Sequence, residues 1–318
     1  MDVLIDLNAV IVSVDGDRPQ VLTVPHAEAG GEAGLPFGPF DPQAHRTLEL
    51  GLRTWVEEQT RLPLGYVEQL YTFGDRGRHG PGEDVRVVSV GYLALTRAAP
   101  RPAETGARWA DWYAFLPWED WRKGPPALIA ERIVPALDAW AGDGPTPARR
   151  ERRRARINAC FGGGGFDWDE ERVLDRYELL YEAGLVRERA RDDAGTVTLS
   201  GPSPLGADRP MPFDHRRILA TAIGRLRAKL KYRPVVFELM PATFTLLELQ
   251  RCVEAVTGAG FHKQNFRRYV ERSGLVEPTG AIVARGPGRP AAEHRFKREA
   301  LLERPATGVR VSPTLGPR

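Results

Sequence analysis

The sequence predicts an α+β protein that is divided into two domains. The first 141 residues mix strand-like, β-branched segments with an amphipathic helix, whereas the last third is mostly helical and ends in two short strands. The length of 318 residues suits two domains of about 100–200 residues each. Because 42% of the residues are hydrophobic, the chain has enough apolar surface for packed cores, which excludes a wholly disordered protein.

Residues 1–141 are expected to form one α+β domain. Strands are predicted at 3–14, 20–24, 66–73, 85–96 and within 109–121, because these segments alternate or are rich in β-branched residues. The segment HRTLELGLRTWVEEQT (45–60) places Leu48, Leu52 and Val56 at helical spacing and predicts an amphipathic helix. A further helix at 126–141 is expected to close the domain.

Residues 142–212 are expected to be a linker and an inserted helical segment. The run RRERRRAR (149–156) is interpreted as a solvated helix face, with an arm that contacts nucleic acid as the alternative. An amphipathic helix that ends at Gly184 is predicted within 169–186, which leaves an interaction scaffold as a third function. Residues 191–212 are rich in turn residues and are expected to be exposed.

Residues 213–300 follow the element order of a winged helix domain. Three helices and a hairpin are predicted in turn, at 213–232, 244–258, 263–274 and 275–298. Asp214 is a candidate N-cap for the first helix, and Thr245 with Glu248 forms a capping-box pattern at the second. Helix, helix, turn, helix and hairpin is the winged-helix order, and residues 301–318 are expected to be a tail.

The formal charge is distributed unevenly along the chain. Residues 211–304 hold 18 lysines and arginines against 9 acidic residues, whereas residues 1–210 carry a net charge of −8 within a total of +3. A basic C-terminal third is typical of a domain that meets a polyanion. A solvated basic surface is the alternative.

The helix at 262–274 has the composition of a helix that enters a DNA major groove. Phe266, Tyr269 and Val270 lie at i, i+3 and i+4 and supply a core face. The polar remainder can bond base edges or phosphates, and it comprises His262, Lys263, Gln264, Asn265, Arg267, Arg268 and Arg272. On the hairpin, Arg285, Arg289, Arg295 and Lys297 suit phosphate or minor-groove contacts. A helical dimerisation domain with a basic surface is the alternative.

Cysteine content and the N-terminus predict a cytoplasmic protein. Cys160 and Cys252 are too few for a disulfide framework, which favours a reducing compartment. Asp2 and Asp6 lie where a signal peptide would need lysine or arginine. No run of about 18 apolar residues is present, so we expect no contact with a membrane.

The segment GPFDPQAHRTLELGLRTWVEEQTR (38–61) resembles the Nudix box of the Nudix hydrolases. Arg53 takes the arginine position, and Glu57 and Glu58 take the positions of the paired glutamates. In that family, carboxylates on the helix hold Mg²⁺ against a pyrophosphate. Thr54 departs from the pattern at a metal-ligand position, so Glu57 and Glu58 are the remaining metal candidates. Ion pairs of Arg53 with Glu49 and Glu57 are the structural alternative.

The whole layout resembles the NrtR-type transcriptional regulators of NAD metabolism, which join a Nudix-like domain to a winged helix. The motifs that carry this resemblance are TFGDR (72–76), VRVVSVGYLALT (85–96), DHRRILATAIGRLRAKLKY (214–232), ELMPATFTLLELQ (238–250), KQNFRR (263–268) and GRP (288–290). The central block of about 142–210 is not part of the usual family pattern.

The resemblance implies an α/β/α sandwich that senses a nucleotide, followed by a DNA-binding domain. The expected effector is ADP-ribose or a related nucleotide, and its expected contacts are Arg53, Glu57, Glu58 and Arg76. The expected partners are a double-stranded DNA operator and a second copy of the chain, and no cofactor is required. The alternative is an active, Mg²⁺-dependent Nudix hydrolase of the ADP-ribose pyrophosphatase type.

Overall fold

A computed structural model describes residues 2–75, 77, 85–97, 105–196, 199, 201–206, 208–284 and 290–297. Its centre is a mixed β-sheet with the strand order β3-β2-β1-β6-β5, in which β4 also pairs with β1 and β7 with β2. These strands are β1 (Asp2–Asp15), β2 (Arg18–His26), β3 (Glu32–Gly34), β4 (Phe37–Pro39), β5 (Tyr66–Phe73), β6 (Val85–Leu95) and β7 (Arg108–Asp111). β1 and β6 run parallel, and the other pairs are antiparallel.

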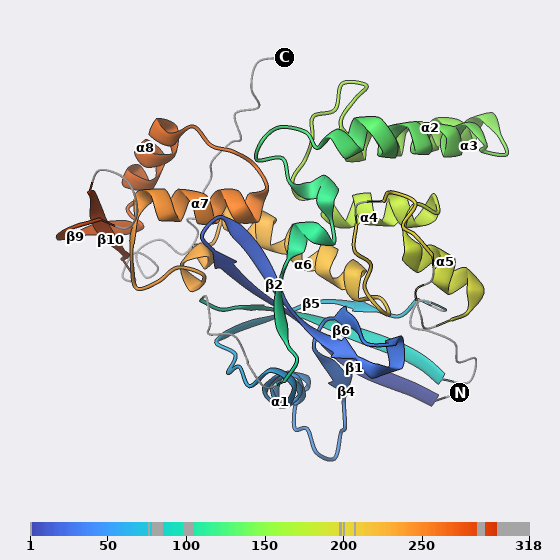
Figure 1. Ribbon diagram of the computed structural model, residues 1–318, viewed down its shortest axis with the longest axis horizontal. Coiled ribbons are helices and arrows are strands. Elements are labelled where there is room, and N and C mark those ends of the chain that lie inside the picture. The colour runs from blue at the N-terminus through green and yellow to red at the C-terminus, as the bar shows by residue number, and fades with distance from the viewer. Residues whose placement is uncertain are drawn as a thin grey trace.

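Helices cover both faces of this sheet (Figure 1). Along β1, Leu7, Ala9 and Ile11 pack in one core with helix α1 (Leu48–Thr60), whereas Val10 and Val12 pack in a second core with α6 (His215–Leu230). This alternation is the period of two that a strand imposes on its side chains. α6 lies so close to β6 that a Cβ on Gly91 would come within 3.1 Å of the Ile218 side chain. The predicted α+β class and sandwich are confirmed, with α6 in the second helical layer.

The start of α6 differs from the expectation in its cap. The helix follows Asp214, but the Asp214 side chain makes no capping hydrogen bond. Its carboxylate instead pairs with Arg217 at 3.0 Å. Asp214 is therefore the N-cap residue, as predicted, but its side chain pairs with Arg217 one turn along the helix instead of capping a backbone N–H.

The segment between the sheet and α6 is more ordered than the sequence predicted. After β7 come the short 3-10 turns η2 (Trp112–Ala114) and η3 (Pro117–Glu119), so the strand expected within 109–121 ends at Asp111. The helices that follow are α2 (Val134–Gly142) after a π-turn η4 (Ile129–Ile133), α3 (Pro147–Phe161), α4 (Val173–Glu182) and α5 (Arg187–Ala194). The expectation that 191–212 is exposed was wrong in part, because Leu205 and Met211 are buried in the core.

The arginine-rich run 149–156 lies in α3, which forms an antiparallel hairpin with α2 at the edge of the molecule (Figure 1). Arg149, Arg152 and Arg154 are exposed to solvent. Arg153 instead lies 3.9 Å from the ring centroid of Trp140 and donates to its carbonyl. These positions agree with a largely solvated helix face.

The C-terminal domain has winged-helix architecture. It consists of η5 (Val235–Glu238), β8 (Thr243–Thr245), α7 (Leu246–Thr257), α8 (Lys263–Ser273), β9 (Val276–Val283) and β10 (Ala291–Phe296), with the strand order β8-β10-β9. The predicted capping box at α7 is confirmed, because Thr245 and Glu248 bond each other's backbone N–H groups. Among the described residues, no helix is both long and apolar enough to cross a membrane.

Candidate nucleic-acid interface and effector site

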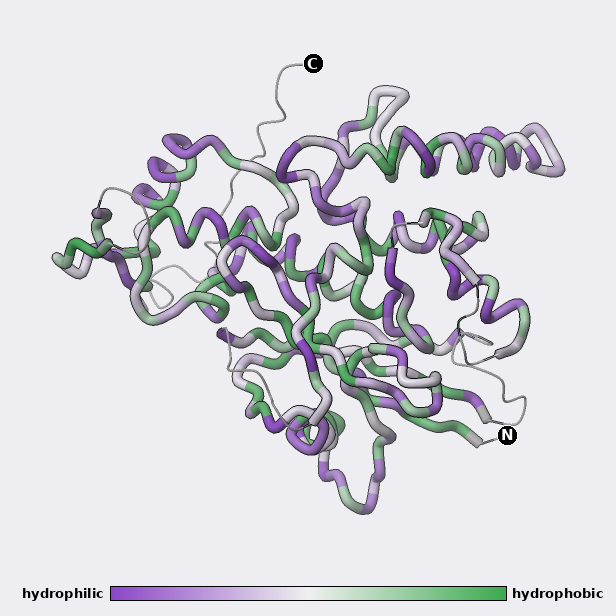
Figure 2. Tube along the Cα trace, in the orientation of Figure 1, coloured by the Kyte–Doolittle hydropathy of each residue, from purple (hydrophilic) through white to green (hydrophobic). Residues whose placement is uncertain are grey.

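α8 separates a buried face from a polar face. Phe266 and Val270 are 0% and 2% exposed and anchor the helix to the domain core, with Tyr269 packed beside them. The residues on the other side are all exposed to solvent, namely His262, Lys263, Gln264, Asn265, Arg267, Arg268 and Arg272. Figure 2 shows α8 as largely hydrophilic in contrast to the apolar centre of the molecule.

The turn before α8 is fixed by two polar side chains of α7. The Gln250 amide donates to the Phe261 carbonyl at 2.9 Å, and Glu254 accepts from the Phe261 N–H at 2.9 Å. Gln250 also donates to Glu254 at 2.9 Å, so all three groups form one network. The polar face of α8 therefore has a defined orientation relative to α7 before any partner binds.

The cations of α8 are available for a partner. In the part of the chain that the structure describes, no carboxylate forms an ion pair with Lys263, Arg267 or Arg268. Arg268 makes one exposed bond of 3.3 Å to Asn265 on its own helix. Guanidinium forks and amides presented in this way match the acceptors of base edges and phosphates.

The hairpin contributes a smaller set of described residues. Arg295 is exposed and pairs with Glu277 on the neighbouring strand at 2.7 Å. Lys297 is half-buried and its backbone N–H bonds the Leu275 carbonyl. Arg285 and Arg289 lie outside the described residues. Their contacts with DNA, like those of α8, stay predictions.

The helix that carries the Nudix-like box is attached to the sheet through its own box residues. Arg53 pairs with Glu49 at 2.9 Å and also donates to the carbonyls of Leu64 and Gly65. Trp55 donates to the Pro39 carbonyl at 2.9 Å. The predicted ion pair of Arg53 with Glu49 is therefore present, and much of the guanidinium is used internally. Binding of an effector by Arg53 stays a prediction.

The box carboxylates lie exposed on α1, without a third metal-ligating side chain beside them among the described residues. Glu57 and Glu58 are exposed, and the Thr54 hydroxyl, at the position of a metal ligand in the box, bonds the Leu50 carbonyl at 3.1 Å. Within the described ranges, no group of three or more His, Cys, Asp or Glu side chains could hold a metal ion. Mg²⁺ is commonly held by one or two carboxylates while waters and substrate phosphates complete its shell, so binding of Mg²⁺ by Glu57 and Glu58 stays a prediction.

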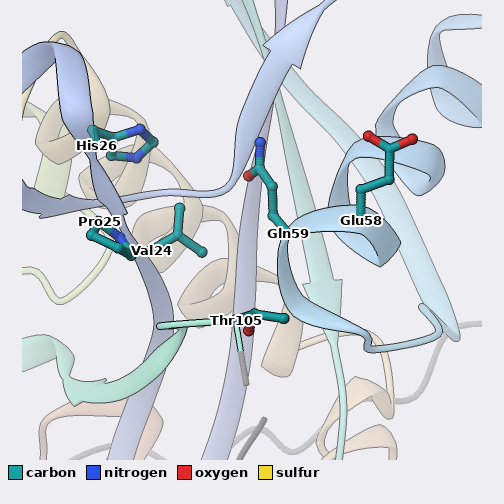
Figure 3. A pocket seen from close by; sticks show the side chains of 6 residues that line it. All are labelled: Val24, Pro25, His26, Glu58, Gln59 and Thr105. Atoms are coloured by element: carbon teal, nitrogen blue, oxygen red, sulfur yellow. The ribbon is translucent and has the colours of Figure 1, made fainter. Parts of the chain in front are cut away.

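A cavity of about 260 Å³ lies between β2 and the end of α1. It is lined by Val24, Pro25, His26, Glu58, Gln59 and Thr105 (Figure 3). Burial lowers the pKa of His26 below its usual 6.5, so the ring is neutral at pH 7. Its Nε2 lies 2.9 Å from the Leu35 carbonyl and therefore carries the proton. Ligand pockets usually span about 300–1,000 Å³, so this cavity is slightly smaller than a typical pocket and has room for part of a nucleotide such as ADP-ribose.

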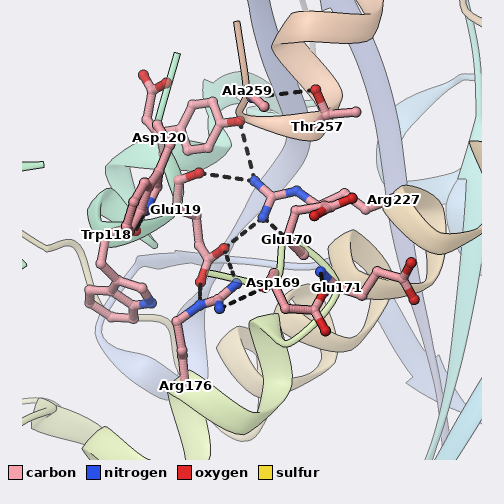
Figure 4. A network of polar contacts seen from close by, with 12 residues as sticks. Trp118, Glu119, Asp120, Asp169, Glu170, Glu171, Arg176, Arg227, Thr257 and Ala259 are labelled. Atoms are coloured by element: carbon pink, nitrogen blue, oxygen red, sulfur yellow. Dashed lines mark hydrogen bonds and ion pairs between the residues drawn. The ribbon is translucent and has the colours of Figure 1, made fainter. Parts of the chain in front are cut away.

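A buried ionic network connects the turn η3 with α4, α6 and α7 (Figure 4). Glu119 is fully buried and accepts from Arg176 of α4 at 2.6 and 2.9 Å and from Arg227 of α6 at 2.6 Å. Burial alone would raise the pKa of Glu119, but the two guanidinium charges outweigh burial and hold this pKa below its usual 4.5. The carboxylate is therefore ionised at neutral pH.

The same network holds the end of α7. Arg227 donates to the Val256 carbonyl at 3.0 Å, and the Tyr113 hydroxyl donates to the Ala255 carbonyl at 2.8 Å. The backbone N–H of Trp121 donates to the Gly258 carbonyl at 2.7 Å. Three carbonyls at the C-terminus of α7 are thus satisfied by groups outside the winged helix. Direct hydrogen bonds therefore hold the end of α7 against α6 and against the segment from η2 to Trp121.

Several of these residues were not among the sequence-based candidates. His26 and Thr105 lie outside every motif that the sequence offered, and Gln59 lies within the Nudix-like segment 38–61 but at a position that was not a candidate. Arg227 offered a signal, because helical spacing places it on the same face as the apolar Ile223 and Leu230. Arg76, predicted to bind the effector, lies outside the described residues.

Comparisons with known proteins agree with this geometry. Residues 236–296 match the family model of the NrtR DNA-binding winged helix domain. The curated ADPR responsive transcriptional repressor NtrR of Acinetobacter baylyi is 41% identical over 86 residues, which is 27% of this chain and 34% of the relative. The match thus spans about a third of that relative's length.

Two solved structures share the fold. NrtR of Shewanella oneidensis in complex with a 27mer DNA gives a TM-score of 0.56 at 20% identity, over 96% of this chain and 98% of that one. A MutT/nudix family protein from Enterococcus faecalis gives a TM-score of 0.51 at 15% identity, over 93% and 87% of the two chains. The protein therefore has the fold of NrtR, and its residues 236–296 form an NrtR-type winged helix domain.

Proposed function

We propose that the protein is a transcriptional regulator that binds a double-stranded DNA operator and responds to ADP-ribose or a related nucleotide. The observation that carries this proposal is α8, whose buried side is anchored by Phe266 and whose outer side presents exposed cations. A helix that serves only for dimerisation would not require exposed cations on its outer side. The sequence match of the domain to NrtR supports the same function.

The nucleotide response is assigned to the Nudix-like domain. Its support is the cavity beside Glu58, together with the curated relative, whose name describes it as ADPR responsive. No cofactor is required for such a sensor, because it has only to bind its ligand more tightly in one state of the protein than in the other. The regulated genes are proposed to be those of NAD metabolism. A cytoplasmic location remains a prediction.

Two copies of the chain are proposed to act together on the operator. A single helix in the major groove reads a short half-site, and a two-fold symmetric pair reads a palindrome with half-sites about one helical turn apart. Analytical ultracentrifugation of the protein with a palindromic fragment measures this stoichiometry. Two protomers per fragment are expected, and one protomer at saturation would refute the pairing.

DNA binding is tested by fluorescence anisotropy with a labelled fragment from the gene's own promoter region and a scrambled fragment of equal length. The wild-type protein is expected to prefer the promoter fragment and to bind more weakly as salt rises. The double variant Arg267→Gln/Arg268→Gln is expected to lower the slope of log K against log salt by about 0.9 for each phosphate that the protein no longer neutralises. The matched control is Arg46→Gln/Arg61→Gln, which removes two exposed arginines beside α1.

The outcomes separate the alternatives. Binding to neither fragment at low salt would overturn the proposed function. An equal fall in affinity in both double variants would mean that the charge of the whole molecule, rather than α8, binds DNA.

A second candidate function is Mg²⁺-dependent hydrolysis of a nucleoside diphosphate derivative. The observation that favours it is the exposure of Glu57 and Glu58, which leaves both carboxylates open to a metal brought by a substrate pyrophosphate. Release of AMP from ADP-ribose with Mg²⁺, abolished in Glu57→Gln and kept in Glu49→Gln, would support hydrolysis. No turnover across a panel of nucleoside diphosphate derivatives would remove it.

A further inference from the structure

The cavity wall is connected to a cluster of rings at the start of α6. The ring cluster consists of His26, Phe37, Phe213 and His215. His26 belongs to both the cavity wall and the cluster. Phe213 and His215 lie at the beginning of α6, about 180 residues farther along the chain than the cavity wall. The cavity and α6 are therefore separated by one layer of side chains.

The ring cluster is tightly packed. The His26 ring centroid lies 5.0 Å from that of Phe37 and 5.2 Å from that of His215. Phe37 is likewise 5.3 Å from Phe213 and 5.2 Å from His215. These spacings fall within the range of favourable aromatic contacts. A displacement of one ring is therefore resisted by all the others.

Backbone hydrogen bonds link the two sides of the cluster. The Leu35 carbonyl accepts from His26 at 2.9 Å, and the Leu35 N–H donates to Nδ1 of His215 at 3.0 Å. A Cβ on the adjacent Gly34 would come within 2.6 Å of the same Nδ1 atom. His26 and His215 are thus held through a single, closely packed peptide segment.

Gln59 provides a second connection from the cavity to the cluster. Its side-chain amide accepts from the Phe37 N–H at 3.2 Å and donates to the Phe37 carbonyl at 2.6 Å. Figure 3 shows His26 and Gln59 on opposite sides of the cavity. A ligand seated between them would press on both connections at once.

α6 continues the path to the winged helix. Arg227 lies three turns beyond His215, about 18 Å along the helix axis. At that end its guanidinium bonds the Val256 carbonyl of α7 and the buried Glu119. A shift at the first turn of α6 would therefore be carried by one continuous helix to the carbonyls that orient the winged helix.

We propose that the ring cluster senses occupancy of the cavity and that α6 transmits the change to the winged helix. This inference rests on the proposed function, because it assigns the route of that regulation. It requires the cluster and α6 to have two arrangements for which the ligand has different affinities. Phe37 and His215 are positioning residues in this route, whereas His26 itself lines the cavity.

The test measures operator affinity with and without saturating ADP-ribose. For the wild-type protein the ratio of the two dissociation constants is expected to lie within about 5–150-fold. Phe37→Leu removes a ring of the cluster without altering a residue that lines the cavity. The variant is expected to bind ADP-ribose with wild-type affinity and to bring the ratio close to one.

Phe40→Leu is the matched control, because Phe40 is equally half-buried and lies three residues away but pairs with His45 rather than with the cluster. It is expected to keep the wild-type ratio. If Phe37→Leu fails to fold, His215→Gln replaces it, since glutamine keeps an acceptor for the Leu35 N–H. An unchanged ratio in the folded cluster variant would overturn the route while leaving the proposed function intact. A wild-type ratio of one would overturn both.

Discussion

Replacing Glu119 with glutamine is expected to destabilise the protein strongly. The substitution keeps the shape of the side chain but removes the carboxylate that lies between two fully buried guanidinium groups, those of Arg176 and Arg227. Glu119 accepts three charge-assisted hydrogen bonds, and the amide nitrogen of glutamine would face at least one donor. Breaking one member of a buried ionic group typically costs about 3–5 kcal/mol.

Urea unfolding at pH 7 measures this loss. With a slope of about 3 kcal/mol/M, a loss of about 3–5 kcal/mol lowers the unfolding midpoint by about 1–1.7 M. Glu182→Gln is the control, because Glu182 forms an exposed ion pair with Arg156 and is expected to change the free energy of unfolding by less than about 1 kcal/mol. A Glu119→Gln midpoint within about 0.3 M of the wild-type value would refute the reasoning.

Four further outcomes follow from the same structure. Phe266→Ala should lower the free energy of unfolding by about 3–5 kcal/mol, since the ring is fully buried, and a loss below about 1 kcal/mol in urea unfolding would contradict its place in the core. Arg267→Ala should weaken operator binding while thermal unfolding stays nearly unchanged; a large fall in the melting temperature would instead indicate a structural role. Gly258→Ala should be strongly destabilising, because this residue has a φ of 71° and the added Cβ would lie 2.4 Å from the carbonyl oxygen of Glu119. A variant with the melting temperature of the wild type would contradict this packing. Folding lowers the pKa of Glu119, so the contribution of its carboxylate to the free energy of unfolding is complete above pH about 4.5 and is lost as the pH falls toward the folded pKa. The difference in the free energy of unfolding between wild type and Glu119→Gln should therefore shrink in acid. A difference that stays constant with pH would contradict the assignment.

The elements that the sequence predicted well are those governed by local patterns. The β-branched segment 3–14 predicts a strand, and the structure has β1 there, with Leu7, Ala9 and Ile11 on one covered face and Val10 and Val12 on the other. The capping box at Thr245 and the apolar spacing of α8 are likewise local features. These signals depend on neighbours within one or two turns, so the sequence alone is sufficient to locate them.

The residues that were not predicted depend on contacts between distant segments. Glu119 and Arg227 lie 108 positions apart, and no sequence pattern indicates that they form an ion pair. The cavity wall combines His26 of β2 and Gln59 of α1, which come together only in the folded chain. Asp214 is the N-cap residue as predicted, but the sequence did not show that its carboxylate pairs with Arg217. Sequence patterns therefore could not predict the polar contacts between distant segments, which make up most of the site.

Hydrogen exchange of the full chain, with operator DNA and with ADP-ribose added separately, tests the central claim most directly. DNA is expected to slow amide exchange within 262–274. ADP-ribose is expected to slow exchange around 24–26 and 58–59 and to alter exchange at the start of α6. Protection by DNA confined to α3, or an ADP-ribose effect that never reaches α6, would contradict the central claim.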